Sequence, residues 1–454
     1  MAKYKAYPEY KDSGVEWLGR IPEQWTVSKV KYLAPFQVGW TPPTKNDENF
    51  IGNNLWVTIS DLRDKFISAS AKFISNKAVK EASMNITPKG SLLYSFKLSV
   101  GAVSFAGCNL YTNEAIASFL ENAHLPLSYL YYSLPIFIIE NASTNIYGAK
   151  ILNQELIKNS FLLAAECGES EKISVFLDHE TAKIDNLLEK QQQLIELLKE
   201  KRQAVISHAV TKGLNPDAPM KDSGVEWSGD VPSHWLKTII KHIAKINPLK
   251  TKIAPDIMKK ECSFIPMENL KLNKIILDEH RVIRDVYNSY TYFEDKDILM
   301  AKVTPCFENK NIAIANNLLN GVGFGTTEIY VIRCNNKINN EYLFYRLQED
   351  NFSAIAEGSM TGAGGLKRVP HEVVNSFQFY LPTIYEQNEI ASFLNSATTK
   401  IDTLIQKQLQ QIDLLKERRT ALISAAVTGK IDLRDWTPPA SSTESSLTAE
   451  ETTA

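Results

Sequence analysis

Residues 173–210 read ISVFLDHETAKIDNLLEKQQQLIELLKEKRQAVISHAV, and residues 390–427 read IASFLNSATTKIDTLIQKQLQQIDLLKERRTALISAAV. The two stretches align without a gap at a constant offset (390 − 173 = 217), and roughly half of their positions are identical. Neither contains Gly or Pro, and both are rich in the helix formers Leu, Lys, Glu, Gln and Ala. We therefore expect two long helices, each on the order of 60 Å long at 1.5 Å per residue.

Each predicted helix carries an apolar seam. Its apolar residues alternate at spacings of three and four, which is the heptad pattern of a coiled coil. The seam consists of Ile184, Leu188, Ile195, Leu198 and Val205 in the first copy and of Ile401, Ile405, Ile412, Leu415 and Leu422 in the second, and Leu187, Leu194 and Leu404 widen it. A lone helix of this length would expose its seam, so each copy needs a partner. Because a globular stretch separates the copies, we expect them to pack antiparallel.

Polar residues also recur in register along the two seams. Gln191 matches Gln408, and Arg202 matches Arg419. A polar residue buried in a seam costs stability, but it can fix the register and the choice of partner. Alternatively, these side chains face solvent where the seam drifts around the helix. The sequence leaves both interpretations open.

A second repeat precedes each globular stretch, at a similar offset (221 − 11 = 210). Residues 11–25 read KDSGVEWLGRIPEQW, and residues 221–235 read KDSGVEWSGDVPSHW. Since the two periods nearly agree, the chain is a tandem duplication. The Gly and Pro residues predict a loop that folds back on itself. The Trp residues of both copies are candidate anchors, most simply structural ones: Trp17, Trp25, Trp227 and Trp235.

The composition bounds the class of protein. With 454 residues the chain is long enough for two to four domains. The formal net charge is -2, so any nucleic-acid binding must come from local patches. The 5 Cys are scattered and form no CxxC pair, which suggests neither a disulfide framework nor a zinc site. There is no apolar signal peptide and no apolar run long enough to span a bilayer, so we expect no membrane association and a cytoplasmic protein.

The globular stretches mix strand and helix patterns. In the first, residues 55–59 and 91–96 predict strands, 127–140 predicts a short buried helix interrupted at Pro135, and 156–163 is another strand candidate. The second follows the same outline with different side chains, with strand patterns at 263–266 and 297–302 and a helix pattern at 341–348. The predicted class is α+β: two globular mixed α/β domains separated by a long antiparallel two-helix coiled coil, with an internal tandem duplication.

These patterns divide the chain into segments. They are a first globular domain at 1–170 with an N-terminal loop at 10–25, a helical region at 171–214, a second globular domain at 215–386 with a linker loop at 220–235, a second helical region at 387–432, and a tail at 433–454. The tail is rich in Pro, Ser, Thr and Glu, and we expect it to be disordered.

The sequence offers no reaction centre. It contains no GxxxxGK[ST] phosphate loop, no HExxH metal motif and no Asn/Asp-Pro-Pro-aromatic stretch of the kind that amino-methyltransferases use. The glycines at 321–325 lack the spacing of a nucleotide-binding fingerprint and predict a plain turn. His179 and His208 lie on the first helix, but the second copy has Ser396 and Ala425 there, which argues against a catalytic role. We predict no catalytic and no metal-binding residue.

The chain resembles the specificity subunit of type I restriction-modification systems. The resemblance rests on the KDSGVEW segment of both halves, with the Gly, Pro and Trp that follow it. It rests also on the helix ends, which read VTKGLNP at 210–216 and VTGKID at 427–432. The resemblance covers the helices and linkers well, whereas the globular domains match only in outline.

The resemblance implies a division of labour. Two target recognition domains would each read one half of a split target on double-stranded DNA. The antiparallel helices would separate these domains and dock two methyltransferase (M) subunits, which bind S-adenosylmethionine. Restriction (R) subunits would supply translocation and cleavage with ATP and Mg. This chain would hold no cofactor and no active site. Because the two domains differ in sequence, the two half-sites should differ as well.

Candidate DNA contacts are loops that pair small residues with a cation, together with nearby polar side chains that suit base edges. The candidates are Ser95, Lys97, Asn145 and Lys150 in the first domain and Lys302, Thr304, Asn309, Lys310, Lys367 and Arg368 in the second. For each residue taken alone, a solvated surface position is the simpler interpretation.

Two other functions stay open on the sequence alone. A non-catalytic coiled-coil scaffold with protein-binding domains would retain no specific DNA, even with its partners present. A stand-alone enzyme, such as a methyltransferase, would bind S-adenosylmethionine as the isolated chain.

Overall fold

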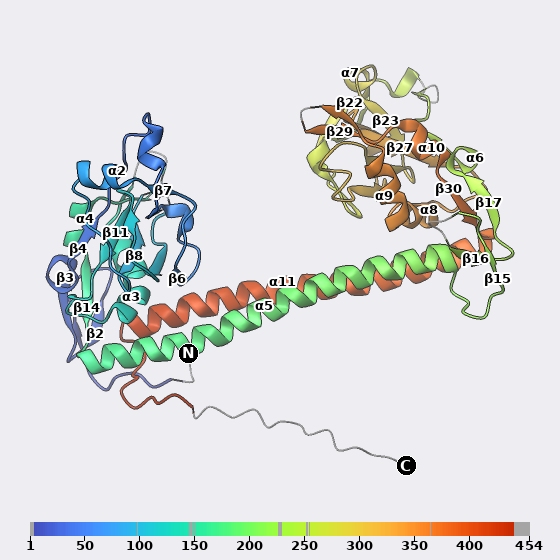
Figure 1. Ribbon diagram of the computed structural model, residues 1–454. Helices are drawn as coiled ribbons and strands as arrows, with labels where there is room; N and C mark the ends of the chain where they lie inside the picture. Colours follow the sequence, from blue (N-terminus) through green and yellow to red (C-terminus); the bar gives the residue numbers. More distant parts are fainter. Residues whose placement is uncertain are drawn as a thin grey trace, which may run out of the picture. The chain divides into compact units, whose positions relative to one another are not determined.

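The computed structural model divides into two compact units (Figure 1) and describes residues 4–97, 99–144, 148, 150–225, 229–250, 253, 255–363 and 365–439. Unit 1 comprises Met1–Lys190 and Gln411–Ala454, and unit 2 comprises Gln191–Gln410. The long helices α5 (Cys167–Lys212) and α11 (Ile384–Val427) each contribute residues to both units. Both helices were predicted, and each extends the predicted stretch at its N-terminal end.

The main sheet of unit 1 is largely antiparallel, with strand order β4-β11-β8-β9-β6. Its strands are β4 (Phe36–Val38), β6 (Phe66–Ile67), β8 (Leu92–Ser95), β9 (Val103–Ala106) and β11 (Ile116–Phe119). β8 and β11 are buried along their whole length, so this sheet forms part of the core. The smaller ladders are β1 (Tyr10–Asp12) with β2 (Arg20–Pro22), β3 (Thr26–Lys29) with β14 (Phe161–Ala164), β12 (Ser143–Thr144) with β13 (Lys150–Ile151), and β5 (Asn54–Val57) between β7 (Phe73–Ile74) and β10 (Tyr111–Thr112).

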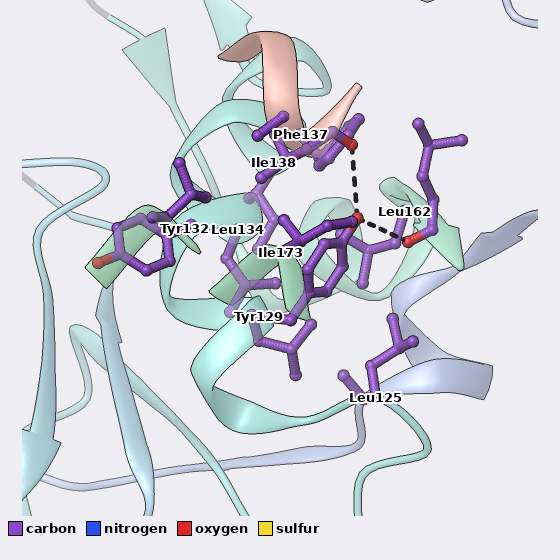
Figure 2. Close-up of a cluster of buried hydrophobic side chains, with 14 of the residues drawn as sticks. Leu125, Tyr129, Tyr132, Leu134, Phe137, Ile138, Leu162 and Ile173 are labelled. Atoms are coloured by element: carbon purple, nitrogen blue, oxygen red, sulfur yellow. Dashed lines mark hydrogen bonds between the residues drawn. The ribbon is translucent and has the colours of Figure 1, made fainter. Parts of the chain in front are cut away.

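Unit 1 also contains shorter helices. Besides part of α5 and α11 they are α1 (Val30–Leu33), α2 (Asn76–Glu81), α3 (Leu127–Glu140) and α4 (Gln154–Asn159), with 3-10 turns η1 (Asp47–Phe50) and η2 (Ile59–Asp61). Figure 2 shows the buried Tyr129 of α3. Its hydroxyl donates to the carbonyl oxygens of Leu163, at 3.2 Å, and Val427, at 3.4 Å. Tyr129 therefore ties α3 to β14 and to the end of α11.

Unit 2 contains sheets with strand orders β18-β27-β24-β25 and β22-β19-β26-β23. Their strands are β18 (Ala244–Ile246), β19 (Glu261–Ile265), β22 (His280–Val282), β23 (Thr291–Glu294), β24 (Ile298–Ala301), β25 (Ile312–Ile314), β26 (Val322–Gly325) and β27 (Ile329–Cys334). The two-stranded ladders are β15 (Met220–Asp222) with β16 (Asp230–Pro232), β17 (Leu236–Ile239) with β30 (Gln378–Leu381), β20 (Leu270–Lys271) with β21 (Lys274–Ile275), and β28 (Thr361–Ala363) with β29 (Leu366–Arg368).

The shorter helices of unit 2 repeat one packing contact of unit 1. They are α6 (Ile240–Ile243), α7 (Ile283–Val286), α8 (Asn340–Arg346), α9 (Asp350–Gly358) and α10 (His371–Ser376), with 3-10 turns η4 (Pro255–Ile257), η5 (Met267–Asn269) and η6 (Leu319–Gly321). The hydroxyl of the buried Tyr342 on α8 donates to the carbonyl oxygen of Val210 at 3.3 Å. Tyr342 thus ties α8 to the end of α5, as Tyr129 ties α3 to the end of α11.

The ends of the long helices have local causes. Gly213 directly follows α5 with φ 78°, and Gly429 follows α11 with φ 72°, a conformation that glycine adopts without strain. At the start of α11 the Thr383 hydroxyl accepts from the Glu386 backbone N–H at 3.4 Å. The Glu386 carboxylate accepts from the Thr383 N–H at 3.1 Å in return. This reciprocal capping box fixes where α11 begins.

The predicted mixture of helix and strand is present in both units, but three local predictions were wrong. Residues 156–163 do not form one strand, because the Asn153 side chain caps α4 by accepting from the Leu156 N–H at 2.8 Å. Helix α3 continues through Pro135, because burial of Leu134 and Phe137 offsets the hydrogen bond that proline removes.

The third wrong prediction is the plain turn at 321–325, which contains strand β26. A Cβ at Gly323 would lie 2.0 Å from the ring of Phe293. The glycine is therefore required because a buried aromatic ring packs directly against the backbone of the strand.

The predicted disordered tail at 433–454 begins too early. Leu433 is buried, and the ring of Trp436 packs against that of Phe176 with 5.3 Å between centroids. These apolar side chains keep the chain packed at least as far as Trp436. Residues 437–439 are exposed and form no helix or strand, and residues 440–454 lie outside the described residues.

Candidate functional site

An exposed hairpin of unit 2 carries two of the predicted DNA contacts. Strands β28 and β29 form it, and every described side chain in them is exposed. The hairpin is fixed to the loop after β24, since the Thr304 N–H donates to the Lys367 carbonyl at 3.0 Å and the Thr304 hydroxyl accepts from the Lys367 N–H at 3.0 Å. These bonds hold the backbone of Lys367 while its side chain lies in solvent.

The neighbouring Arg368 is neutralised within the unit. Its guanidinium donates two hydrogen bonds to the Glu328 carboxylate, at 2.8 and 2.9 Å. These bonds hold the pKa of the Glu328 carboxyl below its usual value. Lys302 lies alongside, because its N–H donates to the Glu328 carbonyl and its carbonyl accepts from the Val369 N–H. The fold thus brings Lys302, Thr304, Lys367 and Arg368 together in one patch. Lys367 is exposed there, whereas Lys302 is half-buried, with its ammonium 5.4 Å from the ring centroid of Tyr330.

The other predicted readers of unit 2 differ in availability. Asn309 is exposed. The Lys310 ammonium donates to Gln203 at 2.8 Å, to the Gln348 carbonyl at 3.2 Å and to Asp350 at 3.3 Å. Because these bonds tie its side chain to α5 and to the start of α9, Lys310 has a structural role. The prediction that Lys310 reads bases is therefore corrected.

In unit 1 the predicted contacts are more dispersed. Ser95 is fully buried, and its hydroxyl accepts from the Ala102 N–H at 3.1 Å and donates to the Ser99 carbonyl. It closes the loop after β8 and cannot reach a ligand, so that prediction is corrected. Lys97 is exposed on this loop, and Lys150 is exposed on β13. Asn145 lies outside the described residues.

Both units present a hairpin of the same kind, β12–β13 in unit 1 and β28–β29 in unit 2. Each hairpin follows a helix of its unit, α3 or α9, and each sets a lysine beside an exposed apolar residue. The apolar residues are Ile151, which is 45% exposed next to Lys150, and Leu366, which is 53% exposed next to Lys367. Because consecutive strand residues point to opposite faces, the lysine is the member of each pair that can be assigned to a phosphate.

Glu328 is a residue of this patch that the sequence analysis missed. A signal was present, because Thr327 and Glu328 occupy the place in the second half that Asn113 and Glu114 occupy in the first. Glu114 accepts a hydrogen bond from the Thr41 hydroxyl. The acidic position is therefore shared by the two units, and in unit 2 it holds an arginine.

The seam residues lie between the long helices with different degrees of burial. Ile184, Ile195, Ile401, Ile412 and Leu422 are buried, and Leu188, Leu198, Val205, Ile405 and Leu415 are half-buried. The expected widening of the seam is wrong, since Leu187, Leu194 and Leu404 are 45%, 39% and 44% exposed. A strict heptad seam is narrower than the apolar stripe of a globular helix, which accounts for the difference.

The arginines that recur on the seams pair across the helices. In unit 2 the Arg202 Nε donates to Asp402 Oδ1 at 2.9 Å, and in unit 1 the Arg419 Nε donates to Asp185 Oδ1 at 2.9 Å. The later part of each helix therefore meets the earlier part of the other, which is an antiparallel pairing. Gln191, the other polar position of the first seam, is half-buried.

The second repeat fastens the helix ends. In unit 1 the Trp25 indole N–H donates to Glu169, at the start of α5, at 3.1 Å, and the ring lies against Gly429, after α11. In unit 2 Trp235 lies in the same way between Glu386, at the start of α11, and Gly213, after α5. The other tryptophans of the repeat differ: Trp17 is 42% exposed, and Trp227 lies outside the described residues.

A model of the type I restriction modification DNA specificity domain matches residues 22–197 and 243–414. The chain belongs to this family. The double match confirms the resemblance stated from the sequence and the tandem duplication. Among the described residues, no helix is long and apolar enough to cross a membrane, and no three His, Cys, Asp or Glu side chains gather as they would around a metal ion.

The chain is also similar in sequence to individual type I specificity subunits. The EcoAI specificity subunit of Escherichia coli is 37% identical over 187 residues, 40% of this chain and 31% of that protein. The MjaIX specificity subunit of Methanocaldococcus jannaschii is 30% identical over 203 residues, 43% of this chain and 46% of that protein. This chain thus matches less than half the length of either relative.

Other similarities to this family run through nearly the whole chain. The MjaVIII specificity subunit of Methanocaldococcus jannaschii is 22% identical over 427 residues, 92% of this chain and 95% of that protein. A solved structure from work on complex assembly and conformational transition of the type I R-M system has a TM-score of 0.62 at 13% identity, covering 90% of this chain and 99% of that one. The predicted α+β class is confirmed by this shared fold.

Proposed function

We propose that this chain is the DNA specificity subunit of a type I restriction-modification complex and has no catalytic activity of its own. The observation that carries the proposal is the double match to the specificity domain, in which each copy combines one long helix with a globular region whose sequence differs from that of the other copy. Closely similar helices with dissimilar units suit one shared platform and two different targets.

Each unit would read one half of an asymmetric, bipartite sequence in double-stranded DNA. The hairpins β12–β13 and β28–β29 supply contacts to the DNA backbone, with Lys150 and Lys367 on phosphates. Lys97, Lys302, Thr304 and Asn309 complete the set. The length of the antiparallel helix pair would set the number of unread base pairs between the half-sites.

The helix pair would also dock two methyltransferase subunits and, through them, restriction subunits. S-adenosylmethionine, ATP and Mg would be bound by those partners, and the complex would act in the cytoplasm. The exposed remainder of α5 and α11, outside the seam, offers the surface for such docking.

Exchange of residues 236–386 for the corresponding domain of another family member tests this function. Mapping of methylated adenines in cells that carry the chain and its methyltransferase should show one half-site changed and the other kept. Two unchanged half-sites, or no methylation that depends on this chain, would contradict the proposal.

A second experiment tests the hairpin. Lys367→Ala removes one phosphate contact, so DNA affinity should fall for all sequences alike, and the slope of log affinity against log salt should become shallower by about 1. Lys237→Ala is the matched control, because Lys237 is an exposed lysine of the same unit on β17. An unchanged salt slope in the Lys367 variant would remove the hairpin from the interface.

A further inference from the structure

Unit 2 contains an open apolar hollow beside the end of α5. Its volume is about 540 Å³, and its lining includes Val205, Ala209 and Leu214 from α5 and the residues after it, together with Phe393 from α11. Phe393 is 44% exposed and Leu214 is 43% exposed. Large apolar side chains exposed next to one another on a hollowed surface indicate a binding site for an apolar group. We call this hollow the Phe393 socket.

The same position in unit 1 is filled by the chain itself. Phe176 is the counterpart of Phe393 at the helix offset, and it is fully buried. Two rings cover it edge-on: that of Tyr4, at 5.3 Å and 87°, and that of Trp436, at 5.3 Å and 84°. Unit 1 therefore shows which group completes such a socket, namely an aromatic side chain in T-shaped contact.

In the part of unit 2 that the structure describes, the segments at this position carry no such rings. In unit 1 they come from the two ends of the chain, which the Asp432 N–H joins by donating to the Lys5 carbonyl at 2.8 Å. In unit 2 a single linker at 213–220 takes their place, and its sequence, GLNPDAPM, contains no aromatic residue. Since no described residue of this linker places a ring against Phe393, an occupant from another chain is favoured.

The basic side chains at the rim of the socket favour an aromatic group that has acidic residues next to it in its own chain. Lys201 and His208 line the socket and are exposed. In unit 1 the Tyr4 hydroxyl donates a hydrogen bond to the Glu180 carboxylate. The counterpart of Glu180 in unit 2 is Ala397. A ring flanked by Asp or Glu complements this rim, and a tyrosine hydroxyl would find no such acceptor there.

We propose that the Phe393 socket receives an aromatic side chain, flanked by carboxylates, from one of the two methyltransferase subunits. The inference rests on the proposed function. The Trp436 of a second copy is not available for this role, because it is held against Phe176. Since the socket of unit 1 is filled internally, the two methyltransferases are not held in the same way. Only the one at unit 2 depends on Phe393.

The test is the stoichiometry of the purified complex, measured by native mass spectrometry after co-expression with the methyltransferase. The unsubstituted chain should bind two methyltransferases. Phe393→Asp should bind one, because losing an aromatic anchor weakens that site by about tenfold or more. Leu249→Asp, which changes an apolar residue of unit 2 that is 70% exposed, should still bind two.

A photo-crosslinking residue in place of Phe393 keeps an aromatic ring there and avoids any loss of folding. It should link to a methyltransferase peptide that carries an aromatic residue next to Asp or Glu. The proposal would be overturned if Phe393→Asp still bound two methyltransferases or bound none. It would also be overturned if the crosslinks reached only a second copy of this chain. No methyltransferase on the unsubstituted chain would instead refute the proposed function itself.

Discussion

Replacing Asp402 by Ala should destabilise the helix pair far more than replacing Asp185 by Ala, although the two residues make the same ion pair in the two repeats. Their partners differ in burial: the Arg202 side chain is 8% exposed, and the Arg419 side chain is 34% exposed. Loss of Asp402 leaves a buried guanidinium without its counter-ion, which costs about 3 kcal/mol or more. Loss of Asp185 leaves an arginine that water can solvate, which costs roughly 0.2–1 kcal/mol.

The comparison is internally matched. Both substitutions introduce Ala for Asp within a helix, so the gain in helix propensity is the same and cancels in the difference. A difference of about 2 kcal/mol should remain, which corresponds to roughly thirtyfold in the equilibrium for local opening. Hydrogen exchange followed by mass spectrometry resolves this opening for each segment of the helices.

The expected result is faster amide exchange in residues 191–212 and 384–410 of Asp402→Ala, with little change in any segment of Asp185→Ala. Arg202→Met serves as the control, because it removes the buried charge along with its pair and should be nearly neutral. Equal acceleration in the two Asp variants would refute the argument that burial of the arginine decides the cost.

Two further perturbations test the anchors and the core. Trp25→Ala should lower the free energy of unfolding by about 3–5 kcal/mol in urea denaturation, because its ring is fully buried, whereas Trp17→Ala, at a position 42% exposed, should cost about 1 kcal/mol or less. Burial raises the pKa of Glu349 to about 6, above its unfolded value near 4.3, so the folded state binds the proton more tightly. Unit 2 should therefore gain up to about 2 kcal/mol as the pH falls from about 7 to about 4.5, and Glu349→Gln should abolish this gain.

The helices could be predicted because their signal is local and repeated. A stretch free of Gly and Pro with a heptad seam has few alternatives to a paired helix, and the second copy supplies an independent reading of the same pattern. The partners of the arginines were missed for a different reason. Asp185 and Asp402 are two among many charged residues on these helices, and choosing them requires the register of an antiparallel pair, which no local pattern contains.

The candidate site could be predicted only in part. The sequence indicates loop positions for Lys302, Thr304, Lys367 and Arg368, and the fold brings them together because the hairpin is hydrogen-bonded to the loop after β24. Ser95 is polar as well, yet it is the last residue of a fully buried strand, and its hydroxyl bonds within the loop that follows. Residue type alone does not separate the buried Ser95 from the exposed Lys367, because the fold decides which side chains at a strand end face the core.

The two repeats show why the helices stay alike while the units diverge. In unit 1 the carboxylate at the start of α5, Glu169, accepts from Trp25 and from the Tyr7 hydroxyl. In unit 2 the equivalent Glu386 accepts from Trp235 and bonds to His234. The second partner has changed, but the tryptophan and the carboxylate are retained.

This clamp consists of residues at the helix ends and in the repeats at 11–25 and 221–235, together with Tyr7, and none of them lies in the hairpins β12–β13 or β28–β29. A change in a hairpin therefore removes no hydrogen bond of the clamp. Conversely, the bonds that position Lys367 involve Thr304, which belongs to unit 2 and not to the helix pair. Because the two sets of contacts share no residue, side chains suited to a new DNA sequence can replace the old ones without loosening the helix ends.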